Sequence, residues 1–154
     1  MSEKESGVKI MATNKKAFHN YHILEKCETG IVLVGCEVKS VRSGQINLQD
    51  GFVRDKNGEL WLFNCYLSPY TQASGHIPDP TRDRKLLLHK VEIVRLLRKS
   101  VTKGLTMVPL KLYLKKGRVK VEIGLAQPKK LFDKRRALKE KTVNRDISRG
   151  LRSR

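Results

Sequence analysis

The chain has few cysteines and no long apolar segment. Cys27, Cys36 and Cys65 are odd in number, widely spaced and free of any CxxC pair. This pattern predicts neither a disulfide framework nor a zinc ribbon, but the ordinary buried thiols of an intracellular protein. No stretch approaches the ~18 apolar residues of a membrane span, and the N-terminus lacks the apolar region of a secretion signal. We therefore expect a soluble, cytoplasmic protein with no membrane partner.

Sequence patterns of catalysis are missing as well. The motifs GxSxG, GxxxxGKS/T, GxGxxG and HExxH do not occur. His19 and His22 lie three residues apart, but no carboxylate or thiol completes a metal site with them. The sequence predicts a protein that is not an enzyme and that holds no metal and no cofactor.

Acidic residues are scarce. Against 33 Lys and Arg the chain has 15 Asp and Glu, a net charge of +18. The last 29 residues contain 11 basic and three acidic side chains, more than three times the charge per residue of the preceding 125. Binding a polyanion, with release of its counterions, offsets repulsion of this kind. Nucleic acid is the first candidate. An acidic membrane surface is the second, although the tail lacks Trp, Phe and Leu gathered beside its charges.

The composition divides the chain into three segments. We expect a flexible N-terminal lead over residues 1–12, a folded body over 13–126 and a basic tail over 127–154. The tail has acid-first pairs at helical spacing but no wide apolar face, so a helix there is marginal alone. We expect the tail to be disordered when free and helical when bound to its partner.

Three hairpins are predicted in the body. The first turns at Glu28-Thr29-Gly30, between two apolar runs within 21–35. The second turns at Asn57-Gly58, a dipeptide favoured in type I′ turns. The third turns at Lys116-Gly117, between strands in which apolar and mainly basic side chains alternate.

Helical patterns lie between these strands. One helix follows Thr13 as its cap, a second covers 37–43, and a third covers 89–101, with Val91, Val94 and Leu97 or Arg98 on one side, before Gly104 ends it. Six antiparallel strands without long crossovers favour a closed sheet, because closure removes exposed edges. The predicted fold is mainly β: a six-stranded antiparallel OB-like barrel with about three flanking helices.

Two clusters of side chains are candidates for binding nucleic acid. Near the N-terminus, cations alternate with planar rings, an arrangement that suits unpaired nucleotides; these residues are Asn14, Lys15, Lys16, His19 and Tyr21. A surface helix with one packed face explains this cluster equally well. The segment 68–85 contains three prolines and ends in Arg82, Arg84 and Lys85. It is expected to lie outside the core, either as a solvated loop or as a phosphate clamp.

Several ordered motifs resemble the small protein B family, which binds transfer-messenger RNA. They are NKKAFHNY, GIVLVGCEVKSVRSG, LSPY, DPTRDRKLLLHK, KGLTMVPLKLYLKKGRVKVEIGLA and KKLFDKR, and they span about residues 14 to 136. The resemblance implies an OB-like barrel that binds the tRNA-like domain of the RNA. Gln127-Pro128 departs from the family, which often has Gly after the last strand, and should stiffen the exit from the barrel.

The resemblance also implies which residues contact RNA. On the body the candidates are Asn14, Lys15, Lys16, His19, Tyr21, Glu28, Lys39, Arg42, Arg82, Arg84, Lys85 and Leu86. In the tail, the candidates for the ribosomal decoding centre are Lys129, Lys130, Phe132, Asp133, Lys134, Arg135, Lys139 and Arg145. Glu28 is either an acceptor that reads base or sugar groups, or simply an acid beside a turn.

The function implied is that of an adaptor in trans-translation. It would deliver transfer-messenger RNA to stalled ribosomes, with the body standing in for an anticodon arm and the tail sensing the empty message channel of the small subunit. The expected partners are this RNA, ribosomal RNA and the ribosome, and the chain is expected to be a monomer. The alternative is a generic basic OB-like RNA-binding protein associated with the ribosome.

Overall fold

The fold is built from antiparallel strands flanked by helices. The structure is a computed structural model that describes residues 7–70, 75 and 77–152. Its helices are α1 (Lys15–Asn20), α2 (Gly35–Arg42), α3 (Lys90–Lys103) and α4 (Leu131–Arg152). Its strands are β1 (Val8–Thr13), β2 (Tyr21–Ile31), β3 (Ile46–Asn47), β4 (Phe52–Lys56), β5 (Glu59–Phe63), β6 (Tyr66–Leu67), β7 (Arg84–Leu87), β8 (Thr106–Lys115) and β9 (Arg118–Pro128).

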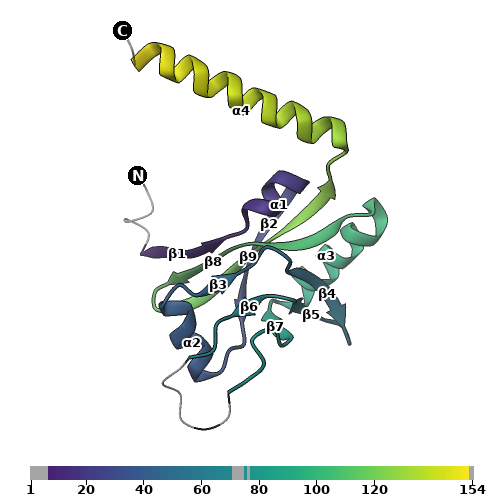
Figure 1. Cartoon of the computed structure of the whole chain (residues 1–154). Coiled ribbons are helices and arrows are strands. Elements are labelled where there is room, and N and C mark those ends of the chain that lie inside the picture. The colour runs from purple at the N-terminus through teal and green to yellow at the C-terminus, as the bar shows by residue number, and fades with distance from the viewer. Residues whose placement is uncertain (1–6, 71–74, 76, 153–154) are drawn as a thin grey trace.

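Six of the strands form a closed circuit. Following the pairings leads from β8 through β4, β5, β7, β2 and β9 back to β8, and each pairing is antiparallel. The long strands β2, β8 and β9 make up one side of this barrel, with β4, β5 and β7 on the other (Figure 1). The predicted mainly β fold with a six-stranded barrel is confirmed. Outside the barrel, β1 pairs with β8, and β3 with β6.

Two of the three predicted hairpins are confirmed. Asn57 and Gly58 join β4 to β5 with φ of 55° and 77°, the left-handed pair that a type I′ turn requires. Lys116 and Gly117 join β8 to β9 with φ of 52° and 75°. In both, the two central residues set the twist that the strands need.

The predicted hairpin at Glu28-Thr29-Gly30 is wrong. β2 runs through these residues without turning and pairs with β9 from Tyr21 to Gly30. Gly30 is needed for close packing instead, since a Cβ there would lie 3.1 Å from the Cβ of Leu87 on β7.

The predicted segment boundaries also need correction. Residues 8–12 are not a flexible lead, because they belong to β1, which pairs with β8; residues 1–6 lie outside the described part of the chain. The body extends past 126, since β9 ends at Pro128. Residues 84–87 at the end of the proline-containing segment form β7, a strand of the barrel, while positions 71–74 and 76 of that segment are not described.

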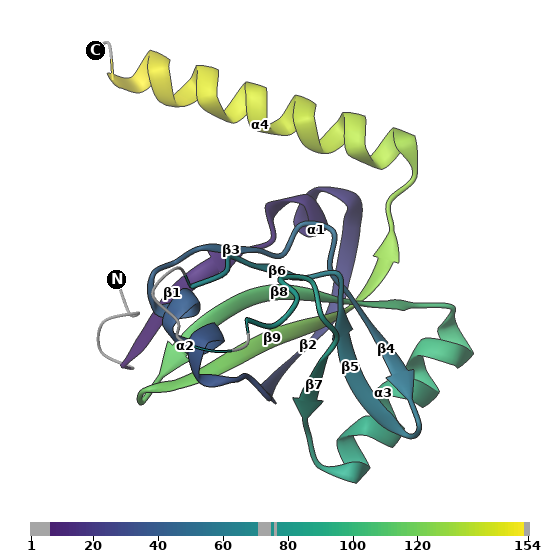
Figure 2. The same cartoon turned by 60° about the horizontal axis from the view of Figure 1, so that its bottom comes forward.

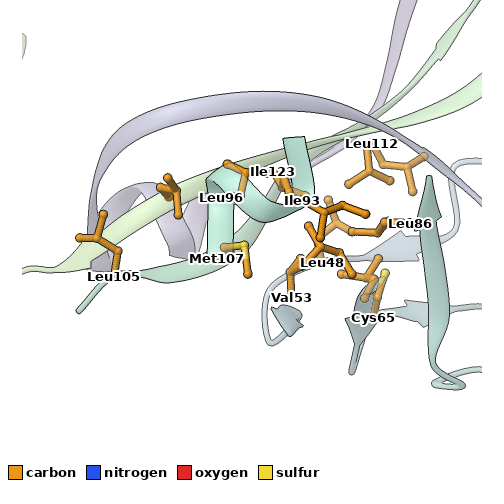
Figure 3. Close-up of a cluster of buried hydrophobic side chains, with 14 of the residues drawn as sticks. Leu48, Val53, Cys65, Leu86, Ile93, Leu96, Leu105, Met107, Leu112 and Ile123 are labelled. Atoms are coloured by element: carbon orange, nitrogen blue, oxygen red, sulfur yellow. The ribbon is translucent and has the colours of Figure 1, made fainter. Parts of the chain in front are cut away.

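The core fills the barrel and extends under α3 (Figure 3). In β5, Leu60 and Leu62 point inward with no exposed surface, while alternate residues point outward. Burying a leucine of this kind stabilises the fold by about 1.5 to 3 kcal/mol. α3 packs through Ile93 and Leu96, with Leu97 partly buried beside them, whereas Val91 is 80% exposed and Val94 52% exposed.

α4 lies apart from the barrel. In both views it runs past the α1 side of the body as a separate helix (Figures 1 and 2). Its 22 residues span about 33 Å at 1.5 Å per residue. Residues 138–150 are exposed throughout, so the helix gains little from burial in the core.

Candidate nucleic-acid interface

A buried asparagine fixes α1 on the barrel. The side chain of Asn14 accepts a hydrogen bond from the Ala17 N–H at 3.0 Å, and so caps the helix. Its amide donates to the carbonyls of Leu48 at 3.0 Å and Pro109 at 2.8 Å. Asn14 is therefore the cap in place of Thr13. Asn14 is only 1% exposed, so its contribution in this structure is to position the helix, and its contact with RNA stays a prediction.

α1 presents its cations outward. Lys15 and Lys16 are exposed and His19 is half-buried, while Ala17 packs into the barrel. Lys16 is held by Asp50, with Nζ to Oδ1 2.7 Å. Since both partners are exposed, this pair contributes little to stability and can be exchanged for a phosphate contact.

A groove separates α1 from α4. It has a volume of about 630 Å³. α1 lines it with Lys15, Phe18 and His19, and the C-terminal segment lines it with Lys129, Ala137, Leu138, Lys141 and Arg145. Cations on both walls and two planar rings on one wall are the groups that hold a phosphate backbone and stack on bases.

The C-terminal segment is anchored at the end of α1. The backbone N–H of Lys129 donates to the Asn20 carbonyl at 2.8 Å, and its ammonium donates to the Phe18 carbonyl at 3.3 Å. These bonds occupy carbonyls in the last turn of α1, which helix geometry leaves unpaired. These bonds therefore fix where the C-terminal segment leaves α1, and so where its side of the groove begins.

Tyr21 lies in a second, smaller groove. This groove has a volume of about 220 Å³. It is lined by residues of α1 and its cap and by residues of the barrel: Asn14, Lys16, Ala17, Asn20, Tyr21, Gln49, Asp50, Gly51, Phe52 and Val108. Tyr21 begins β2 directly after α1 and is half-buried. Lys15 and His19 therefore line the groove between α1 and α4, whereas Lys16 and Tyr21 line the second groove.

Glu28 lies on β2 within a hydrogen-bonded group. The Tyr113 hydroxyl donates to its carboxylate, and the Lys115 ammonium lies 3.3 Å from it. The hydrogen bond from Tyr113, together with Lys115, lowers the pKa of Glu28 below its usual value although burial opposes this. Its side chain remains 39% exposed. It is therefore an ionised acceptor with some surface left for a donor, not an acid beside a turn.

Arg82, Arg84 and Lys85 do not form one phosphate clamp as predicted, because the two arginines pair with Glu37 whereas Lys85 lies opposite Trp61 on the outer face of the sheet. Arg84 has no exposed surface and pairs with Glu37 at 2.6 Å. Arg82 pairs with the same carboxylate at 2.5 Å, and Lys85 with Glu59 at 2.9 Å. Leu86 is 1% exposed and belongs to the core. For Arg84 and Leu86 the prediction of RNA contact is wrong, because reaching them requires opening the barrel.

Lys39 and Arg42 are exposed on α2. The Lys39 ammonium lies 5.2 Å from the ring centroid of Tyr70. α2 and α1 are well separated in both views (Figures 1 and 2). The predicted body residues therefore do not form one site. The two grooves described above both lie at α1.

The tail candidates occupy α4 and the residues before it. Arg135, Lys139 and Arg145 are exposed and Lys134 is half-buried. Phe132 and Asp133 belong to the first turn of α4, but their side chains lie outside what is described. Lys129 and Arg145 reach the groove at α1, and Lys130 is the exposed residue between the β9 end and α4.

Four groove residues were missed from the sequence: Phe18, Ala137, Leu138 and Lys141. Leu138, Lys141 and Arg145 follow one another at steps of three and four residues, which places them on one helix face. That spacing was a usable signal. Phe18 gave none, since an aromatic residue in a short helix is expected to pack inward.

Among residues 7–70, 75 and 77–152, no three His, Cys, Asp or Glu side chains come together in a way that would hold a metal ion. The described helices include none that is long and apolar enough to cross a membrane. The protein is a basic barrel whose grooves are lined by cationic and aromatic side chains, and it carries a polycationic helix. These features place it in the class of RNA-binding proteins.

Comparison with known proteins gives the family. Residues 11–153 match the family described as SmpB protein. An SsrA-binding protein of Sulfurihydrogenibium sp. (strain YO3AOP1) is 56% identical over 144 residues, covering 94% of this chain and 95% of the relative. One from Carboxydothermus hydrogenoformans is 54% identical over 146 residues, covering 95% and 98%. The chain belongs to the SmpB family, and the resemblance seen in its motifs is confirmed.

A solved structure agrees with this assignment. It is described as "tmRNA-SmpB: a journey to the center of the bacterial ribosome" and is 50% identical to this chain, with a TM-score of 0.66. The match covers 78% of this chain and 85% of the other.

Proposed function

We propose that this protein binds transfer-messenger RNA and delivers it to stalled ribosomes as the adaptor of trans-translation. The observation that carries the proposal is the groove between α1 and α4, where Lys15, His19 and Phe18 face Lys141 and Arg145. Its relatives are named for binding SsrA, and its structural neighbour is described with tmRNA and the bacterial ribosome. The protein acts by binding alone, without catalysis, and works as a monomer in the cytoplasm, where ribosomes are found.

The barrel supplies the grip on the tRNA-like domain. A rigid body that presents cations at fixed positions binds an RNA of defined shape better than a flexible polycation, because less entropy is lost. Asn14 gives α1 this fixed position through three hydrogen bonds. Glu28, ionised and partly exposed, contributes selectivity by accepting from base amino groups or sugar hydroxyls, and Lys39 and Arg42 extend the basic surface.

α4 supplies the sensor of an empty message channel. Its described side chains include Lys134, Arg135, Lys139 and Arg145, and such a cationic helix can line RNA walls only where no message already lies. Like charge along an exposed helix opposes helix formation in the free protein. Binding inside the channel removes that repulsion, so the helix is most stable there.

A competition titration tests the function. Full-length protein is titrated with labelled transfer-messenger RNA against unlabelled bulk transfer RNA, at near-physiological salt where non-specific attraction is weak. We expect a preference of a hundredfold or more, which corresponds to ~2.7 kcal/mol. Equal affinity for the two RNAs would leave only a generic basic RNA-binding protein.

A further inference from the structure

The outer face of the β4–β5 hairpin carries three aromatic side chains. Phe52 on β4 and Phe63 and Trp61 on β5 alternate with the buried residues Leu60 and Leu62 and therefore point away from the core. All three are half-buried. The hairpin projects beside α3, on a different part of the barrel from α1 (Figure 2).

Two of these rings and an arginine form a stacked column. The rings of Phe52 and Phe63 are nearly parallel, with centroids 5.4 Å apart and an interplanar angle of 11°. The guanidinium of Arg54 lies 4.8 Å from the Phe52 centroid. Stacked planar groups of this kind accept a nucleobase as a further layer, because both aromatic rings and guanidinium planes stack on bases.

Cations surround the third ring. The Lys56 ammonium lies 4.9 Å from the Trp61 ring centroid, and Lys85 on the neighbouring strand β7 is opposite Trp61 in the sheet. On this face Arg54, Lys56 and Lys85 stand against one carboxylate, Glu59, which pairs with Lys85. The excess of positive charge favours a phosphate backbone over an uncharged apolar partner.

Trp61 contributes a further observation. Its indole N–H is buried and has no hydrogen-bond acceptor among the described residues. Leaving a buried donor unpaired is costly, so an acceptor brought by a ligand would be favoured here. Lys56 lies over the indole ring, and its long side chain can turn toward a phosphate and open the ring to an incoming group.

We infer that the outer face of β4, β5 and β7 is a second RNA contact surface, which holds an unpaired nucleotide by stacking on the Arg54–Phe52–Phe63 column and holds its phosphates with Lys56 and Lys85. We call it the hairpin surface. This inference rests on the proposed function only because it assumes the same class of ligand, single-stranded or loop RNA. The hairpin surface shares Phe52 with the second groove, beside Lys16 and Tyr21, but has no residue in common with the groove between α1 and α4, so RNA can bind that groove and the hairpin surface at once.

The chain provides its own reporter for this surface, because Trp61 is its one tryptophan. Full-length protein is titrated with decauridylate at low salt while indole fluorescence is recorded. We expect saturable quenching, with the same midpoint in a Lys15→Ala variant, whose change lies in the groove between α1 and α4. In an Arg54→Ala/Lys56→Ala variant, which alters exposed side chains and leaves the core intact, the midpoint should rise at least tenfold.

The control is Lys90→Ala/Lys103→Ala, which removes two exposed cations from α3 and should leave the midpoint within twofold of the unmodified protein. Quenching that is absent, or whose midpoint is the same in the Arg54→Ala/Lys56→Ala protein and the control, would overturn the inference. Transfer-messenger RNA binding is measured on the same proteins. Absence of quenching with that binding intact rejects the hairpin surface alone, whereas failure to prefer transfer-messenger RNA rejects the proposed function.

Discussion

Glu37 and Arg84 form an ion pair with a distance of 2.6 Å, in which the arginine side chain has no exposed surface and the glutamate side chain is 4% exposed. Arg84 also donates to the carbonyls of Cys65 at 2.8 Å and Pro80 at 3.1 Å. Glu37 accepts in addition from the Val34 N–H at the start of α2. One pair therefore joins α2, β7 and the segment before β7.

Replacing Arg84 with alanine should lower the free energy of unfolding by about 3 to 5 kcal/mol, because it removes a partner of a buried carboxylate and leaves carbonyls unpaired. Arg82→Ala is the matched control. Arg82 is 28% exposed, so its removal should cost clearly less. Urea unfolding of the two variants makes the comparison, and equal costs would contradict the structural role given to Arg84.

Acid should weaken this pair. Burial alone would raise the pKa of Glu37, but hydrogen bonds from Arg82, the Val34 N–H and Arg84 outweigh it and hold the pKa below the ordinary 4.5. The stabilisation is therefore complete above about pH 4.5 and is lost as the pH falls through the folded-state pKa. Unfolding of the unmodified protein and Glu37→Gln should be compared from pH 7 downward. Their difference in stability should shrink below pH 4.5, and a constant difference would exclude this linkage.

Tyr113 should ionise later than an ordinary tyrosine. Burial raises its pKa well above 10, and the charge of Glu28, to which its hydroxyl donates, raises it further. Ultraviolet absorbance followed through an alkaline titration should show one phenol that resists ionisation. Glu28→Gln removes the charge and should bring that phenol to lower pH. The assignment fails if the titration of Glu28→Gln matches that of the unmodified protein.

Lys15→Ala/Lys16→Ala should weaken binding of transfer-messenger RNA and flatten its salt dependence by roughly one slope unit for each phosphate that is no longer neutralised. Binding is measured at several salt concentrations. Lys90→Ala/Lys103→Ala removes the same amount of charge from α3, away from the grooves at α1, and should keep the original slope. If both variants show the same slope, the lysines of α1 do not lie in the interface.

Truncation after Arg136 should separate the two proposed activities. It removes Lys141 and Arg145 from the groove but keeps α1 and the barrel. Affinity for the isolated RNA should fall by less than tenfold, while tagging of peptides on stalled ribosomes should be abolished. A fall of more than tenfold in the truncated protein would show that RNA binding and sensing are not divided between body and tail.

Helix formation by the tail is checked with the same pair of proteins. The difference in circular dichroism between full-length and truncated protein reports on residues 137–154. α4 is helical in the structure of the chain alone, but repulsion between its exposed like charges weakens it, so the helical signal should be partial in the free protein and larger when small ribosomal subunits are present. An equal helical signal with and without the subunits would contradict folding on binding.

Local signals predicted the fold well where two or three neighbouring residues determine the geometry. Asn57-Gly58 and Lys116-Gly117 were found because a type I′ turn needs left-handed angles that these residues adopt easily. Gly30 has the same local appearance but a different cause, its close packing against Leu87 on another strand. Packing of this kind cannot be read from neighbouring residues.

The site shows the same limit. Lys15, Lys16 and His19 were found as a cluster because they are close in sequence and share a helix. Arg84 looked like a surface cation because arginine is rarely enclosed, and only the position of Glu37, 47 residues earlier, explains its burial. Asn14 was identified as important, yet its partners Leu48 and Pro109 lie on distant segments, so its role as a fixed support was not predictable.

The bonds of Lys129 to the end of α1 determine how a mechanical load travels through the molecule. α4 is exposed from residue 138 to 150, so a pull on the C-terminal helix reaches the Asn20 and Phe18 carbonyls early on its way to the barrel. α1 is in turn tied to the β8 backbone through Asn14. Tension applied to α4 would therefore reach α1 and, through the hydrogen bonds of Asn14, strand β8 of the barrel.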